Sequence, residues 1–392
     1  MSNRRKTLPN GSKQMNVRQI HNPDALLNDT RQQTKCTTNK MSFQQKKKRN
    51  KTEHNKQDYL YICITMPLQL TIYRAGSNIP ALPGNNTFHS TELFHIYEAT
   101  PGYTPLLVVA SLNGQPVAKL LGVVRRSVRL TPPALIKRCE VYGTGEYFVP
   151  DEQCENIFGE MLRKLTHEAL RRSFLIEFRN LDDPRFGYRF FRQNHYFPIN
   201  WLRVRNSLHD NSPVEARFSP SRLRQIRKGL KNGAQVRQAR TPDEIQHFAR
   251  MLHHVYSFKI RRHFPSLRFF RELERQLVNG KQSTIFIVTY KERIIGGSAC
   301  IYSADTAYLW FSGGMRKTYA LQYPGILAVW AALSDAKQRG CRHLEFMDVG
   351  LPFRRHGYRD FVLRFGGRQI STRRWFRFRW TWLNQLLSKL WE

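Results

Sequence analysis

The chain has 392 residues, 41% of them hydrophobic and 12% aromatic, and it carries a formal net charge of +35. This length suits two domains of ordinary size, each able to bury a core. No apolar run reaches about 18 residues, and the basic N-terminus lacks an apolar core, so we expect neither a transmembrane helix nor a signal peptide. The charge predicts an anionic partner: a nucleic acid, an anionic membrane or a phosphate-bearing substrate.

The cysteines and the short motifs argue against a metal site and against a secreted protein. The six cysteines have no paired spacing, which favours a reducing cytoplasm over a disulfide framework. The sequence contains no P-loop, no HExxH, no Cys/His zinc pattern and no nucleophile elbow. We therefore expect a cytoplasmic protein with no metal and no permanently bound cofactor.

The N-terminal segment differs in composition from the rest of the chain. Residues 1–58 hold fourteen Lys and Arg against four Asp and Glu, and they show no apolar periodicity. Such composition predicts a disordered basic tail over residues 1–65. Met66 immediately precedes the first predicted strand and is a candidate for the true translation start.

An internal duplication dominates the remainder of the chain. The first copy is predicted to hold strands at 106–110, 117–124 and 141–143, a helix at 155–171 and a strand at 174–178. The second copy is predicted to hold strands at 285–290, 294–299 and 307–311, a helix at 325–339 and a strand at 343–346. Each copy then enters a loop with a Gly-Tyr pair, Gly187-Tyr188 and Gly357-Tyr358. Hairpin, helix and parallel strand in this order predict two α/β domains in tandem.

The predicted boundaries follow from composition. We place the first domain at 66–205, a polar linker at 206–218 and the second domain at 219–370. The second domain opens with a basic helix at Ser219–Lys231, with Ser219 as N-cap and Pro220 in the first turn. We expect this helix at the junction of the two domains.

Several segments of the second copy resemble the Fem peptidyltransferases. The resemblance rests on residues 219–236, on Leu344–Gly350, on Gly357–Phe361 and on Phe365-Gly366-Gly367. The Fem family and the neighbouring BioF-like acyltransferases are built from two GNAT-type (acetyltransferase) domains. The resemblance implies a tandem GNAT fold over about residues 68–368 and transfer of an acyl or aminoacyl group to an amine.

The chain departs from the Fem pattern at one position. The family has a Phe-Lys pair before the Phe-Gly-Gly, and the resemblance assigns that Lys to acyl transfer, whereas this chain has Phe361-Val362. On a strand, Arg364 would lie on the same face as Val362 and could replace the missing cation. An Arg is not chemically a Lys, so transfer from aminoacyl-tRNA is in doubt.

Asp348 is the leading candidate for a catalytic carboxylate. It follows the end of a predicted strand, where α/β sheets bind ligands, and a carboxylate could take a proton from an attacking amine. The alternative is that Asp348 only caps the following loop. With Tyr358 and Arg364 it forms the predicted catalytic set. Glu345 and Glu177 lie within apolar strands, so we interpret them as buried, paired structural acids.

Basic and aromatic side chains near these motifs are the predicted substrate-binding set. For most of them the alternative is a solvated basic face or a turn. The set comprises Arg224, Arg227, Lys228, Lys259, Arg261, Arg262, Arg316, Lys317, Tyr323, Arg354 and Phe361.

The sequence leaves open which molecule donates the acyl group. The segment 313–325 is basic and glycine-rich but lacks the phosphate-loop spacing of CoA-binding GNAT domains. In the first copy, Glu146 occupies the corresponding loop and would repel a phosphate. Acyl-CoA and aminoacyl-tRNA both remain possible co-substrates.

The C-terminal segment is predicted to be an amphipathic helix over residues 371–392. Its apolar positions recur at helical spacing, and four arginines lie near its start. Such a helix would lie on an anionic bilayer, or it would pack on its own domain.

The sequence as a whole predicts a tandem GNAT acyltransferase, cytoplasmic and peripheral at the inner face of the membrane. Its substrate would be a small or lipid-linked anionic envelope precursor that bears an amine, with tRNA as a further partner. The alternative is a catalytically silent basic protein that binds RNA or anionic lipid.

Overall fold

The fold was analysed in a computed structural model, which describes residues 67–126, 137–256, 264–278 and 282–391. The predicted tail at 1–65 lies outside the described residues. The chain from Met66 onward forms one compact unit. In the described part of that unit, no helix combines the length and the apolar character needed to cross a bilayer.

The first half alternates strands and helices in the predicted order. Its hairpin between β2 and β3 turns at Asn113 and Gly114, both with positive φ (52° and 76°), as a tight two-residue turn requires. The elements are β1 (Gln69–Tyr73), α2 (Thr91–Glu98), β2 (Tyr103–Leu112), β3 (Gln115–Arg126), β4 (Lys137–Tyr142), β5 (Glu146–Tyr147), α3 (Asp151–Leu170), β6 (Leu175–Arg179), α4 (Tyr188–Gln193) and β7 (Phe197–Ser207).

The second half repeats this order after three additional helices. The predicted start of the basic helix is confirmed, because the Ser219 hydroxyl accepts a hydrogen bond from the backbone N–H of Arg222 (3.4 Å). The elements are α5 (Pro220–Lys231), β8 (Gln235–Gln238), α6 (Pro242–Val255), α8 (Leu267–Leu273), β9 (Ser283–Tyr290), β10 (Arg293–Ser303), β11 (Thr306–Gly314), α9 (Pro324–Gln338), β12 (His343–Phe346), α10 (Gly357–Leu363), β13 (Arg368–Phe378) and α11 (Thr381–Trp391). Short 3₁₀ or π segments lie at Gly76–Asn78, Thr87–His89, Val214–Arg217, Glu274–Val278 and Ala320–Gln322.

The strands form one continuous sheet in which the two halves are arranged about its middle. The order is β1-β2-β3-β4-β6-β13-β7-β12-β11-β10-β9-β8, and β5 pairs with β3. Both halves contain an antiparallel hairpin followed by a parallel pair, β4 with β6 and β11 with β12. Gly187 and Gly357 both lie at the starts of short helices, α4 and α10. The predicted duplication of the α/β unit is thus confirmed.

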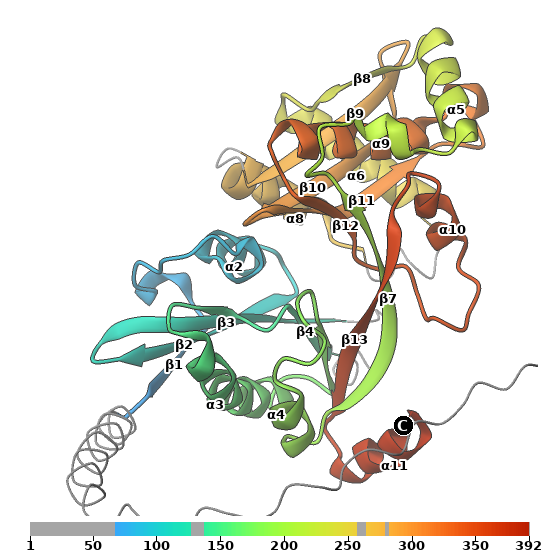
Figure 1. The fold of residues 1–392 in the computed structure, drawn as a ribbon. Coiled ribbons are helices and arrows are strands. Elements are labelled where there is room, and N and C mark those ends of the chain that lie inside the picture. Colours follow the sequence, from blue (N-terminus) through green and yellow to red (C-terminus); the bar gives the residue numbers. More distant parts are fainter. Residues whose placement is uncertain (1–66, 127–136, 257–263, 279–281, 392) are drawn as a thin grey trace, which may run out of the picture. The chain divides into compact units, whose positions relative to one another are not determined.

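The two halves exchange their last strands at the centre of the sheet. Strand β7 follows the first half but pairs with β12 of the second, and β13 follows the second half but pairs with β6 of the first. The two exchanged strands also pair with each other, and Figure 1 shows them as long neighbouring strands that link the two sets of elements. The halves therefore share a hydrogen-bonded core.

The predicted C-terminal helix is wrong for residues 371–378, which belong to β13. In a strand, successive side chains point to opposite faces, and β13 uses both. Arg374 forms ion pairs on one face, whereas Trp375 stacks on Phe191 on the other (ring centroids 4.5 Å apart), and both side chains are buried. The apolar spacing of this segment matches a helix only by coincidence. Pairing with β6 and β7 places Trp375 and Phe376 in a strand.

Three apolar clusters fill the unit. One packs α3 against the first half of the sheet, and a second packs α9 against the second half. The third combines α2, α6 and α8 with strands from both halves. Helix α5 lies on α9 and not at the junction: Ile226 and Leu327 share a cluster, and the Asn232 amide donates to the carbonyl of Leu321 (2.8 Å).

Candidate active site between the two halves

The parallel strands of the second half separate before β11 ends. Their pairing runs from Thr306 with His343 to Leu309 with Phe346. Beyond this point β11 continues along β10 to Gly314. The chain after β12 turns away from β11 and toward β7, where the carbonyl of Gly350 accepts a hydrogen bond from the N–H of Leu202 (3.0 Å). The separation opens a slot at the carboxyl ends of two parallel strands, the usual position for a ligand in an α/β sheet.

A cavity of about 610 Å³ lies at this slot and is lined by both halves. The second half supplies part of β11, Met347 and Asp348, the C-cap of α6 at Tyr256, and side chains of α8 and α10. The first half supplies Tyr97, Tyr103 and a charged floor from β3, β4, β6 and β7, and the exchanged strand β13 of the second half adds Arg374 to this floor. The size is that of a small-molecule pocket.

The floor of the cavity is a network of arginines and carboxylates. Arg125 pairs with Glu140 (2.7 Å), and Arg138 bridges Glu140 and Glu177. On the other side, Glu177 accepts from Arg179 (3.0 Å) and from Arg374 (2.9 Å), and Arg374 reaches Asp348 (3.2 Å). Four arginines thus face three carboxylates, so the wall of the cavity carries a net positive charge.

The arginines control the ionisation of these acids. Burial alone would raise the pKa of Glu140, but Arg125, Arg179 and Arg138 outweigh it and hold that pKa far below its usual range. Burial would likewise raise the pKa of Glu177, and Arg179, Arg374 and Arg138 lower it. Both carboxylates are therefore charged, and ion pairs with arginines hold each of them in place.

This network predicts acid sensitivity. A carboxylate with a lowered folded-state pKa stabilises the fold above its unfolded-state value, 4.5 for Glu, and this stabilisation is lost as the pH falls through the folded-state pKa. We expect the midpoint of thermal unfolding to be nearly constant from about pH 7 to about pH 5 and to fall steeply below about pH 4. A calorimetric series across this range measures the effect, and a midpoint that stays constant down to about pH 3 would contradict it.

Asp348 lies where the slot meets the charged floor. Its carboxylate accepts from the indole Nε1 of Trp201 (3.1 Å) and pairs with Arg374, whose guanidinium stacks on the same indole (4.0 Å). The side chain is 54% exposed because it faces the open cavity, yet the surrounding protein still removes much of its hydration. This desolvation would raise the pKa of Asp348, but Arg374 and Arg179 outweigh it and lower that pKa. Asp348 is thus a fixed anion and a weak base.

The opposite wall of the slot carries phenols and an imidazole. Burial raises the pKa of Tyr358 well above its usual value, and it raises that of Tyr256 to about 12. The Tyr256 hydroxyl donates to the carbonyl of Ser312 on β11 (2.7 Å). His356 also lines the cavity, and its buried Nδ1 has no hydrogen-bond partner among the described residues. The slot therefore offers a protonated phenol and an unengaged imidazole nitrogen beside a carboxylate.

Among its described residues, the first half shows no equivalent slot between β4 and β6. Its parallel strands β4 and β6 stay paired as far as Tyr142 with Arg179, and the N–H of Gly143 still donates to the carbonyl of Arg179 (2.8 Å). A ligand has no opening between these strands.

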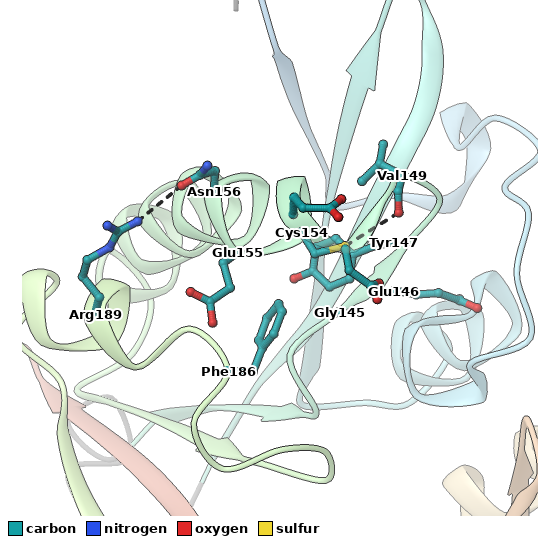
Figure 2. Close-up of a pocket in the computed structure, with 11 residues that line it drawn as sticks. Gly145, Glu146, Tyr147, Val149, Cys154, Glu155, Asn156, Phe186 and Arg189 are labelled. Carbon is teal, nitrogen blue, oxygen red and sulfur yellow. Dashed lines mark hydrogen bonds between the residues drawn. The ribbon is translucent and has the colours of Figure 1, made fainter. Parts of the chain in front are cut away.

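The start of α3 is also unsuited to a phosphate. A hollow there is lined by Glu146, Asp151, Glu152 and Glu155, and Figure 2 shows Glu155 between Arg189 and Phe186 at its mouth. Helix N-termini usually attract anions, but these carboxylates already fill that role and would repel a phosphate. The carboxylate of Glu146 itself is held by Lys119 (3.1 Å) and by the N–H groups of Asn85 and Asn86, so repulsion by Glu146 stays a prediction.

The corresponding helix of the second half, α9, begins in a basic setting. Arg316 and Lys317 are exposed in the preceding turn, and Tyr323 adopts a left-handed conformation (φ 48°) immediately before the helix. Pro324 has no N–H, and the N–H groups of Ile326 and Leu327 both donate to the carbonyl of Tyr323 (2.9 and 3.1 Å). The first turn therefore leaves few backbone donors for a phosphate, and the exposed cations supply the positive charge.

The predicted binding residues fall into separate groups. Arg224, Arg227 and Lys228 are exposed on α5, which lies beside the loop that leads into α9. Arg354 is exposed in the loop before α10, and Phe361 lies beneath the guanidinium of Arg222 (4.4 Å). Lys259, Arg261 and Arg262 lie outside the described residues. Of the predicted catalytic set, Asp348 and Tyr358 line the cavity.

The argument that placed Arg364 on the same face as Val362 is wrong. Both residues belong to a helix and its end, not to a strand: α10 spans Gly357–Leu363, and Arg364 follows it. Two residues along a helix turn by about 200°, so the side chains diverge. Val362 is buried in the core, whereas Arg364 is exposed and does not line the cavity.

The charged floor was missed from the sequence, although a signal for it exists. Arg138, Glu140 and Tyr142 alternate along β4, and Glu177 and Arg179 alternate along β6. Charged residues at period two in otherwise apolar strands indicate a polar site on one face of a sheet. By contrast, the predicted pairing of Glu345 is confirmed, since it bonds Arg203 (2.6 Å) and Arg205 (2.6 Å). The described residues contain no cluster of His, Cys, Asp and Glu able to hold a metal.

Parallel strands that separate beside a helix N-terminus define the GNAT class of fold. Residues 220–355 match the family model described as the acetyltransferase (GNAT) domain, a class that uses acetyl-CoA as co-substrate. The crystal structure of FemX matches with a TM-score of 0.55 at 10% identity, over 79% of this chain and 95% of that one. The predicted tandem GNAT fold is thus confirmed.

Two further solved structures are similar at lower scores. A tandem GNAT protein from the clavulanic acid biosynthesis pathway has a TM-score of 0.47 at 11% identity, over 80% of this chain and 99% of that one. The L-PGS structure from Bacillus licheniformis has a TM-score of 0.46 at 10% identity, over 79% and 92%. No curated protein matches the chain. At such identities the similarity concerns the fold and not the substrate.

Proposed function

We propose that this protein transfers an acyl or aminoacyl group to an amine on an anionic acceptor, and that the transfer takes place in the cavity between the halves. The observation that carries this proposal is the separation of β11 and β12 at Leu309 and Phe346, which opens directly onto Asp348. A catalytically silent binding protein would have no need for such a slot. The net positive charge of the cavity wall supports an acceptor that bears a phosphate or carboxylate, either a small molecule or a lipid-linked precursor.

The second half is the proposed site of the acyl donor. The cations of the segment before α9, Arg316 and Lys317, and the neighbouring face of α5 would hold the donor's phosphates. Acyl-CoA is the donor that a GNAT domain implies, whereas aminoacyl-tRNA would bring tRNA as a partner and requires the cation that Val362 does not supply. We therefore favour a thioester donor.

The side chains of the slot suggest a division of tasks. The amine nitrogen attacks the acyl carbonyl carbon, the bond from that carbon to the donor's sulfur breaks, and the amine loses a proton. Asp348 would hold and orient the amine through its fixed negative charge. His356 would accept the proton that the amine loses, and this proton would pass to the departing thiolate. Tyr358, which keeps its own proton, would donate a hydrogen bond to that thiolate.

Ligand binding gives the first test of this proposal. Acetyl-CoA, longer acyl-CoA esters and aminoacyl-tRNA are each added to the purified protein, and the thermal unfolding midpoint is recorded. We expect a concentration-dependent rise with an acyl-CoA, because a ligand that binds only the folded state stabilises it. The absence of a shift with every donor, at concentrations up to about 1 mM, would count against the proposed transfer.

Turnover gives the second test. With an amine that supports release of free CoA, Asp348→Asn should lower the rate by about 10²-fold or more, the scale of a lost electrostatic contact to the reacting group. Asp183→Asn is the matched control, because Asp183 is similarly exposed (49%) and also pairs with an arginine (Arg185, 3.1 Å) but lies outside the cavity. Equal rates for the two variants would reduce Asp348 to a cap of its loop.

Association with an anionic membrane is a further part of the proposed function, because a lipid-linked acceptor would be reached there. The surface that supports membrane association is formed by the C-terminal helix and a neighbouring loop, and it is separate from the cavity.

A further inference from the structure

The C-terminal helix α11 faces the protein with polar residues and solvent with apolar ones. Asn384 is 2% exposed, accepts a hydrogen bond from the N–H of Phe378 (2.7 Å) and donates one to its carbonyl (2.8 Å). One turn further, the Ser388 hydroxyl accepts from Arg192 (2.9 Å). Polar anchors therefore attach α11 to the end of β13 and to α4. Leu383 and Leu387 are half-buried beside them, and the remaining apolar side chains of the helix are exposed.

The outward side of α11 continues into a neighbouring loop. Phe353, from the loop before α10, lies beside Trp391 (ring centroids 6.3 Å apart), and Trp380 stacks with Trp382 (6.2 Å). We call this surface the tryptophan face; its side chains are between 43% and 74% exposed, and they are Phe353, Trp380, Trp382, Leu386, Leu390 and Trp391. Single exposed apolar residues are ordinary, but six of them on the C-terminal segment and the loop beside it mark an interaction surface.

The charged side chains within the two segments that carry the tryptophan face, 349–358 and 364–391, have one sign. Arg354, Arg355, Arg379 and Lys389 are exposed on the same two segments. Neither segment, 349–358 or 364–391, contains an Asp or a Glu. A protein partner that recognised this surface through salt bridges would usually meet both signs, whereas an anionic bilayer requires apolar and cationic side chains alone.

We propose that the tryptophan face binds the surface of an anionic bilayer. The tryptophans and leucines would enter the boundary between headgroups and acyl chains, and the flanking arginines and lysine would contact the headgroups. Indole rings favour this interfacial depth, and the face lies on a helix and a loop, not in a groove that would fit a peptide. This inference rests on the membrane association in the proposed function and assigns it a surface. It does not rest on acyl transfer, because its residues are outside the cavity.

Vesicle partition tests the proposal with the full-length protein. The wild type and the triple variant Trp382→Ser/Leu386→Ser/Leu390→Ser are mixed with vesicles of phosphatidylcholine alone or with phosphatidylglycerol added. We expect the wild type to sediment with the anionic vesicles far more than with the neutral ones, and the variant to partition about tenfold or more weakly. Salt should weaken the wild-type association, because screening reduces the attraction to headgroups.

Two controls separate the tryptophan face from the rest of this basic protein. Leu230→Ser/Leu321→Ser removes two other exposed apolar side chains (38% and 56%) and should leave partition unchanged. Lipids brominated in their acyl chains should quench the tryptophan fluorescence of the wild type and much less that of the triple variant. Quenching reports insertion, which contact through basic segments elsewhere in the chain would not produce.

Three results would overturn the proposal. The triple variant could bind and be quenched as the wild type is, which would transfer the contact to another surface. The wild type could bind neutral and anionic vesicles equally, which would remove the role of the cations. Finally, neither protein could bind vesicles, while light scattering shows that the wild type self-associates and the triple variant is monomeric. In that case the tryptophan face would bind a second copy of the chain.

Discussion

A protein that ends at Gly367 is expected not to fold, whereas one that ends at Trp380 should retain a cooperative unfolding transition. The shorter chain loses β13, which pairs with β6 of the first half and β7, so both neighbouring strands would lose their partner at the centre of the sheet. It also loses Trp375, whose removal from a core costs about 3–5 kcal/mol by itself, a large part of an ordinary domain's stability.

Circular dichroism and calorimetry on the two truncated proteins measure this difference. The longer chain loses only α11, whose outward side chains are exposed, so we expect a modest fall in the unfolding midpoint. A folded, soluble protein ending at Gly367 would contradict the strand exchange and would mean that each half completes its sheet alone.

The second large effect is expected at Glu345. Its side chain has no solvent exposure, and it pairs with Arg203, which is 3% exposed. Glu345→Ala would leave a buried guanidinium without its partner, so we expect a loss of about 3–5 kcal/mol in the free energy of unfolding. Urea unfolding of the purified variant measures the loss.

A double variant distinguishes a missing partner from a simple cavity. Glu345→Met/Arg203→Met removes both charges and keeps apolar volume, and such replacements are often neutral or stabilising. We expect it to be more stable than Glu345→Ala, while Asp183→Ala at the exposed surface should change little. If the double variant is no more stable than Glu345→Ala, the loss comes from packing and not from the unpaired arginine.

Most of the repeated unit could be predicted from the sequence. The strands at 106–110 and 285–290, the long helices and the Leu/Ile-Glu-Phe strands were located because their apolar periods are long and local. Asp348 was chosen because it follows the end of a strand, where ligands bind, and Tyr358 because it is near Asp348 in the sequence. Both line the cavity, and their catalytic roles stay predictions. These features depend on neighbours within a few residues, which a sequence displays directly.

The errors lie where a segment's partners are far away in the chain. Residues 371–378 have helical apolar spacing, but they form a strand because they pair with β6 and β7. These two strands lie about 170 to 200 residues earlier in the chain. The strand assignment around Arg364 failed because α10 is a short helix whose apolar side, including Val362, is defined by the core beneath it.

The sequence by itself determined the duplicated hairpin–helix–strand unit, the excess of positive charge, the acid positioned at the end of a strand and the apolar C-terminus. Only the tertiary structure decided the exchange of β7 and β13, the cavity with its floor of four arginines and three carboxylates, and which side of α11 remains exposed. The physical reason is the range of the interactions. Periodicity and capping act between near neighbours, whereas strand pairing and buried ion pairs join residues such as Glu177 and Arg374, which only the folded sheet brings together.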